Sequence, residues 1–143
     1  MFRTLLCNAV PKRLLAFDRS MHLIRDRIEE LKPDRIVNFY ELLTSLTVRR
    51  FGIRIPMTGI AHQFLLNHTN YPFARHTGLQ GLLLRLHARL TAWGCSELLA
   101  LSFRPGTSDA RHHIQVVPPL LRREALTGTA SNGGFILGYM VNN

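Results

Sequence analysis

Helix-type and strand-type patterns alternate along this chain, and the alternation restricts the fold more than any other feature. Over residues 14–31 apolar residues recur at steps of three and four, the period of an amphipathic helix. After the Pro33 turn comes a short run rich in β-branched and aromatic residues, as expected for a buried strand. The predicted helices span 14–31, 41–50 and 79–93, and the predicted strands span 35–40, 53–60, 98–103 and 113–117. Such units form a parallel sheet through right-handed crossovers, so the sequence predicts an α/β fold with a parallel sheet flanked by helices.

The pattern changes at the double proline Pro118-Pro119. We expect residues 1–117 to form one domain and residues 118–134, which are first basic and then small and polar, to form a linker. Residues 135–141 read as a further strand that needs partners. The sequence therefore predicts an incomplete domain, an interior stretch of a larger two-domain protein.

The predicted helix at 79–93 has the strongest apolar pattern of the chain. Its apolar positions mark one side, and Arg85 and Arg89 lie on its polar side. Those apolar positions are Leu79, Leu82, Leu83, Leu86, Leu90 and Trp93. Residues 62–73, which precede this helix, carry weak helix signals and many turn residues, so we interpret them as a functional loop.

The charge of the chain favours an anionic partner. There are 18 Lys and Arg residues against 9 Asp and Glu, which gives a formal net charge of +9. Nucleic acid, an anionic membrane face and a phosphate-bearing substrate all fit this charge, and so does a codon bias towards Arg, because the arginines are spread along the chain. We do not favour nucleic acid, because no predicted helix carries clustered basic residues.

Several other classes of protein are not expected. Cys7 and Cys95 lie far apart in no metal or redox spacing, which predicts neither a metal site nor a disulfide and fits a reducing cytoplasm. No apolar stretch approaches the roughly 20 residues of a spanning helix. No Walker loop or dinucleotide-binding glycine motif occurs.

Polar residues follow three of the predicted strands, and the carboxyl ends of parallel strands gather reactive groups. They are Asn38, Tyr40 and Glu41 after the first strand, His62 and Gln63 after the second, and Ser102 and Arg104 after the third. His62 is the best placed, as a base or an anion ligand, although a buried His that holds its loop through backbone hydrogen bonds is an alternative. Glu41 fits a base or a substrate ligand, and equally a carboxylate at a helix start.

Two further candidates are weaker. Ser102 lacks a Gly-x-Ser-x-Gly turn, so we do not expect a hydrolase nucleophile. Arg122 and Arg123, beside the double proline, fit either a phosphate site or a solvated linker. The catalytic residue stays unassigned.

Taken in order, several segments resemble bacterial GT-B glycosyltransferases, in particular hypothetical ones related to the enzyme that adds N-acetylglucosamine to lipid I. They are Pro33-Asp34, Asn38-Phe39-Tyr40-Glu41, Gly59-Ile60-Ala61-His62-Gln63, Leu101-Ser102-Phe103, Val116-Val117-Pro118-Pro119-Leu120-Leu121-Arg122 and Tyr139-Met140-Val141-Asn142. The resemblance implies two Rossmann-like domains, the first for the acceptor and the second for a nucleotide sugar such as a UDP-sugar. It also implies direct displacement without a metal.

The resemblance assigns His62-Gln63 to the place of a His-acid pair on the acceptor side, with Gln63 in place of the acid. By the resemblance, residues 118–134 are the interdomain linker and residues 135–143 hold the first strand of a truncated nucleotide-sugar-binding domain. There is no counterpart here for the opening glycine-rich His turn or for most of that second domain. We therefore expect a fragment, inactive alone, of an enzyme that transfers a hexosyl or N-acetylhexosaminyl group to an acceptor hydroxyl. The acceptor would be lipid-linked or a glycan, reached from the cytoplasm at an anionic inner membrane face. The alternative is a basic module that binds nucleic acid or another anion.

Overall fold

The computed structural model describes residues 11–72, 78–129 and 133–134, and these residues contain a four-stranded sheet. The strands are β1 (Ile36–Asn38), β2 (Met57–Ile60), β3 (Glu97–Leu101) and β4 (Ile114–Val117), in the order β1-β2-β3-β4. All neighbouring strands are parallel. The predicted α/β fold is confirmed. The second strand is shorter than predicted and begins after Pro56, which has no N–H to donate and offers only its carbonyl to Ile36.

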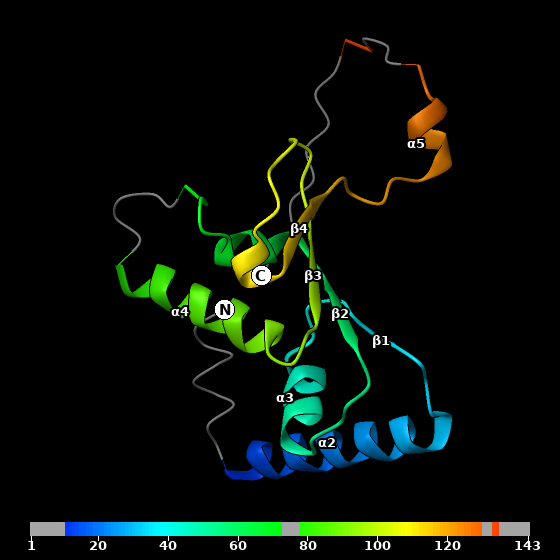
Figure 1. Ribbon diagram of the computed structural model, residues 1–143, viewed down its shortest axis with the longest axis vertical. Helices are drawn as coiled ribbons and strands as arrows, with labels where there is room; N and C mark the ends of the chain where they lie inside the picture. Colours follow the sequence, from blue (N-terminus) through cyan, green and yellow to red (C-terminus); the bar gives the residue numbers. More distant parts are fainter. Residues whose placement is uncertain (1–10, 73–77, 130–132, 135–143) are drawn as a thin grey trace.

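The longer helices lie on one side of the sheet (Figure 1). They are α2 (Pro11–Leu31), α3 (Leu42–Arg50) and α4 (Gly78–Ala92), and α3 packs against both of the others. Two short 3-10 helices, η1 (His62–Asn67) and η2 (Ala110–His112), flank β3 and β4, and a short helix α5 (Arg123–Thr127) stands apart from the sheet. α5 falls within the segment expected to be a linker. The strand expected at 135–141 lies outside the described residues.

The core between sheet and helices is built around Phe64. This residue belongs to η1, in the segment that the sequence indicated as a loop, and its side chain is fully buried beside Leu98, Ala100 and Ile114. Gly59 makes this possible, because a Cβ there would lie 2.9 Å from a ring carbon of Phe64. The strand can therefore accept the aromatic ring only where it carries no side chain.

Helix α4 forms as predicted, but the side that faces the core is not its leucine-rich side. The buried residues are Gly81, Ala88 and Thr91, whereas Leu79 and Leu82 are exposed. The reason is close packing of α4 on α3 through small side chains, since the hydroxyl of the buried Ser45 donates a hydrogen bond to the carbonyl of Thr91. Leucines would hold the two helix backbones too far apart for that bond.

The orientation of α4 predicts that two substitutions on this helix change the free energy of unfolding by very different amounts. Ala88→Leu should lower the free energy of unfolding by about 1–3 kcal/mol, because Ala88 is fully buried and the larger side chain would overpack the inner side of α4. Leu82→Ala should change it by less than about 0.5 kcal/mol, as at other surface positions. Urea unfolding in aqueous buffer measures both. A loss of about 2–5 kcal/mol for Leu82→Ala would instead mean that the leucines form the core face.

Candidate functional site

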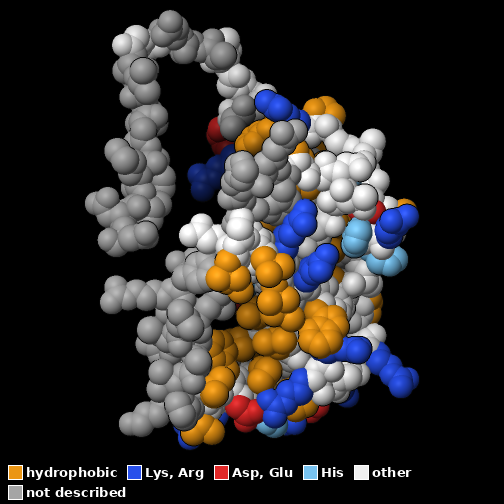
Figure 2. Space-filling model, turned by 90° about the vertical axis from the view of Figure 1, so that its left-hand side faces the viewer, with side chains coloured by type: hydrophobic (Ala, Val, Ile, Leu, Met, Phe, Trp, Pro, Cys, Tyr) orange, Lys and Arg blue, Asp and Glu red, His pale blue; other side chains and the backbone are white. Residues whose placement is uncertain are grey.

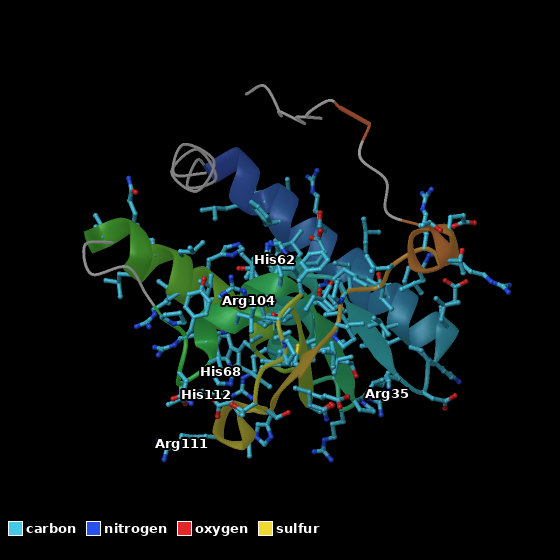
Figure 3. All side chains as sticks on the ribbon, turned by 90° about the horizontal axis from the view of Figure 1, so that it is seen from above. Arg35, His62, His68, Arg104, Arg111 and His112 are labelled. Carbon is cyan, nitrogen blue, oxygen red and sulfur yellow. The ribbon has the colours of Figure 1, made fainter. Side chains whose placement is uncertain are left out.

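The carboxyl ends of β2, β3 and β4 share one edge of the sheet, and two hollows lie there. The first, of about 470 Å³, is lined by His62, Leu65, Leu101, Ser102, Phe103 and Pro119. The second, of about 270 Å³, also includes Leu65 and Ser102 and continues over Arg104, His68 and Thr107. In the view from above, His62 and Arg104 both lie over the sheet, and the two hollows they line share Leu65 and Ser102 (Figure 3). The two hollows together form the candidate site, and neither has an Asp or Glu in its lining.

His62 begins η1 and its side chain is exposed. Its imidazole has no hydrogen bond or ion pair with any residue that the structure describes. The arrangement is thus not that of a buried His fixing a loop, because the ring is available to a ligand. Gln63, the next residue, is half-buried and is not part of either hollow's lining.

Ser102 and Arg104 form a tight turn after β3. The Ser102 hydroxyl donates to the carbonyl of Arg104 at 2.8 Å and accepts from its N–H at 3.1 Å. The N–H of Ser102 donates to Val117 at 2.9 Å, which ties the turn to β4. The guanidinium of Arg104 has no partner among the described residues. The turn therefore presents one arginine at the second hollow.

Asn38, expected at this edge, is used inside the protein. It is only 2% exposed. Its amide nitrogen donates to the carbonyl of Glu41 at 3.1 Å and to the hydroxyl of Ser45 at 2.9 Å, while its oxygen accepts from the N–H of Glu41 at 2.7 Å. These bonds close the turn between β1 and α3.

Tyr40 and Glu41 complete that turn and line neither hollow. Tyr40 has a left-handed backbone, with φ of 63°, and its ring meets Phe64 edge-on at 5.4 Å. Its hydroxyl pairs with Nδ1 of His87 at 3.1 Å, and burial raises its pKa. Glu41 is exposed at the N-cap position of α3 and makes no side-chain capping bond. The structure thus gives Tyr40 a packing role beneath η1.

Arg122 and Arg123 are exposed at the start of α5 and do not line the hollows. Figure 1 shows α5 away from the strands. The structure therefore does not bring this pair to His62.

Asp109, which the sequence did not single out, fastens two loops beside the second hollow. One carboxylate oxygen accepts from the N–H and hydroxyl of Thr69, both at 2.8 Å, and from Nδ1 of His112 at 2.9 Å. The other accepts from the N–H of Arg111 at 3.0 Å. These hydrogen bonds, the one from the Thr69 N–H foremost, hold the pKa of Asp109 well below its usual range. Its sequence signal is an Asp directly before a turn, at the N-cap of η2, which many surface loops share.

His68 reinforces the same loops. Its Nε2 lies 2.9 Å from the carbonyl of Thr107, which can only accept, and its Nδ1 accepts from the N–H of Asn70 at 3.1 Å. Both ring nitrogens are therefore used, and the proton is on Nε2. His68 therefore lines the second hollow with both ring nitrogens hydrogen-bonded, whereas the ring of His62 has no hydrogen bond to any described residue.

Other chemistries lack a site in the described part of the chain. Residues 11–72, 78–129 and 133–134 contain no cluster of three or more His, Cys, Asp or Glu that could hold a metal ion. No helix among them is long and apolar enough to cross a membrane. Burial raises the pKa of Cys95 to about 11, so this thiol is protonated at neutral pH and is not a nucleophile.

The comparisons with known proteins give one match. The model of a family described as Glycosyl transferase family 1 matches residues 1–143. No curated protein and no solved structure matches the chain.

The role of Asp109 predicts a pH dependence. Because its pKa is lowered on folding, its contribution to stability is present above about pH 4 and is lost as the pH falls below that value. Asp109→Asn should lower the melting temperature at pH 7 and flatten its decline on acidification. Asp34→Asn, at an exposed turn, is the matched control and should leave both unchanged. Equal acid sensitivity of wild type and Asp109→Asn would contradict this role.

Proposed function

This chain belongs to glycosyl transferase family 1, and from that membership we propose that it takes part in the transfer of a hexosyl or N-acetylhexosaminyl group from a nucleotide sugar to an acceptor hydroxyl. The observation that carries the proposal at residue level is the exposed imidazole of His62 at the shared carboxyl edge of the sheet. We assign this edge to the acceptor. The reaction would take place in the cytoplasm, at the inner face of the membrane if the acceptor is lipid-linked.

Direct displacement at an anomeric carbon needs a base on the attacking hydroxyl and positive charge or dipoles near the leaving diphosphate. His62 can accept the hydroxyl proton, because a neutral imidazole has a free lone pair and its ring meets no internal partner among the described residues. Ser102 lines the same hollow, and its hydroxyl, whose proton is donated within the turn, would help to position the acceptor through its remaining lone pair. Arg104 adds a positive charge at the second hollow, which also includes Ser102. The absence of carboxylates from both linings suits a substrate that carries phosphate.

The donor has no comparable site in the described residues. They contain one sheet, and its carboxyl edge lacks a glycine-rich phosphate loop. We propose that the nucleotide sugar is held by a second domain, so that this chain alone does not catalyse transfer. The finer likeness to enzymes that act on lipid I rests on sequence segments such as His62-Gln63, and we retain it as a hypothesis for the acceptor.

His62→Asn tests the acceptor site. Binding of methyl glycosides of glucose, galactose and N-acetylglucosamine can be measured by NMR titration of the whole chain. The substitution should weaken binding about 2- to 10-fold, the effect of losing one neutral hydrogen bond. His113→Asn is the matched control, because His113 is an exposed histidine that lines a hollow at the amino end of β4. Equal binding by both variants would remove His62 from the site.

The donor assignment predicts a negative result. A bound ligand at 100 times its Kd would stabilise the fold by about 2.7 kcal/mol. Because we place the donor site on a second domain, UDP-N-acetylglucosamine and UDP-glucose should cause no such stabilisation, and no saturable rise in the melting temperature of this chain. A saturable rise with either compound would show that the chain holds the donor, and the acceptor assignment would then have to be revised.

A further inference from the structure

Helix α4 turns a row of large apolar side chains outward. The exposed fractions are 67% for Leu79, 63% for Leu82, 48% for Leu86 and 46% for Trp93 just beyond the helix end. Their spacings of three, four and seven residues place them on one side, opposite the buried Gly81, Ala88 and Thr91. We call these four residues the α4 apolar face. Figure 2, which looks at the side where α4 lies, shows apolar side chains gathered in a patch with basic side chains beside it.

The surroundings of the α4 apolar face are basic. Helix α4 carries Arg85 and Arg89 and no acidic residue. The guanidinium of Arg49, from α3, lies over the ring of Trp93 at 5.3 Å from its centroid. No Asp or Glu occurs anywhere between residues 42 and 96. The apolar face therefore has positive charges beside it and no carboxylate on its own helix to offset them.

We propose that the α4 apolar face docks on an anionic membrane surface, with the leucines and Trp93 in the interface and the arginines at the level of the lipid headgroups. A helix with leucines and a tryptophan on one side and arginines beside them lies in the plane of an interface. Trp prefers the boundary between headgroups and acyl chains, and each arginine near the surface adds attraction to anionic lipid. Positive charge alone would fit many partners, but the combination with exposed leucines selects a lipid surface.

The proposed function places the reaction at the inner face of the membrane if the acceptor is lipid-linked, and this inference adds the surface that would dock there. That surface and the acceptor hollow are neighbours. Helix α4 packs against η1, the element that begins with His62. A chain docked through α4 would therefore hold its acceptor hollow near the membrane, within reach of the polar end of a lipid-linked substrate.

Trp93 is the only tryptophan of the chain, so its fluorescence reports on this surface alone. The test uses the whole chain with vesicles of equal parts phosphatidylglycerol and phosphatidylcholine, and with vesicles of phosphatidylcholine only. Anionic vesicles should co-sediment with the protein and shift the Trp93 emission to shorter wavelengths. Binding should weaken as salt is raised, and phosphatidylcholine vesicles should bind much less.

Leu82→Glu should weaken binding to anionic vesicles at least about tenfold, because one buried leucine contributes that much or more and the carboxylate repels the lipid. Leu126→Glu adds the same charge at a leucine that is 68% exposed on α5, and should leave binding nearly unchanged. Circular dichroism of both variants checks that they are folded.

Four outcomes would overturn the proposal. They are binding without an emission shift, equal losses in the two variants, equal binding to both kinds of vesicle, and light scattering that shows a dimer which Leu82→Glu dissociates. The last would assign the α4 apolar face to a second copy of the chain. If the vesicles do not bind but His62→Asn still weakens sugar binding, the proposed function stands. The two failures are therefore distinguishable.

Discussion

The contact between the ring of Phe64 and the backbone of Gly59 is the constraint on which the rest of this structure depends. A Cβ at residue 59 would lie 2.9 Å from both the Phe64 ring and a methyl group of Leu98. With the ring in that space, η1 is held against β2 and β3, and Tyr40 supports it from the other side with its hydroxyl paired to His87. Because Phe64 is fixed only two residues later, His62 is held at the rim of the sheet with its own side chain in solvent. The buried Phe64 thus positions the exposed imidazole without using the hydrogen bonds of the imidazole itself.

The same division between anchoring and free groups runs through the site. Hydrogen bonds within the loops of the protein engage Asp109, His68 and the Ser102 hydroxyl. Among the described residues, His62 and the guanidinium of Arg104 make no such bonds. These two groups are therefore the ones that the linings of the two hollows leave available to a ligand.

Sequence patterns predicted the strands and helices because those patterns are local: period two or a short apolar run for a strand, period three to four for a helix. They could not predict which side of α4 faces inward, since Ser45 and Thr91, which decide it, are 46 residues apart and are both small and polar. The 3-10 helix η1 was missed for a similar reason, because its stability comes from the burial of Phe64 against Gly59 and not from helix propensity. At the candidate site, position after a strand was enough to predict that His62 and Ser102 lie at the carboxyl edge of the sheet. It could not separate them from Asn38, whose buried hydrogen bonds depend on the fold of the following turn.

Charge alone left two explanations of the arginine excess, a codon bias and an anionic partner. In the structure some of the arginines have carboxylate partners and others have none. On α2 some arginines meet carboxylates, as in Arg25 with Asp26 and Arg27 with Glu30, and Arg50 of α3 reaches Asp18. Arg35 lies 3.9 Å from Glu97 below the sheet. Arg49, Arg89 and Arg104 have no acidic partner among the described residues. They lie on α3, on α4 and in the turn after β3, which border the α4 apolar face and the candidate site. Arg19 on α2 and Arg111, Arg122 and Arg123 also have no acidic partner among the described residues. What sets Arg49 and Arg89 apart is their place beside the exposed leucines of α4, in a stretch, residues 42–96, that contains no carboxylate.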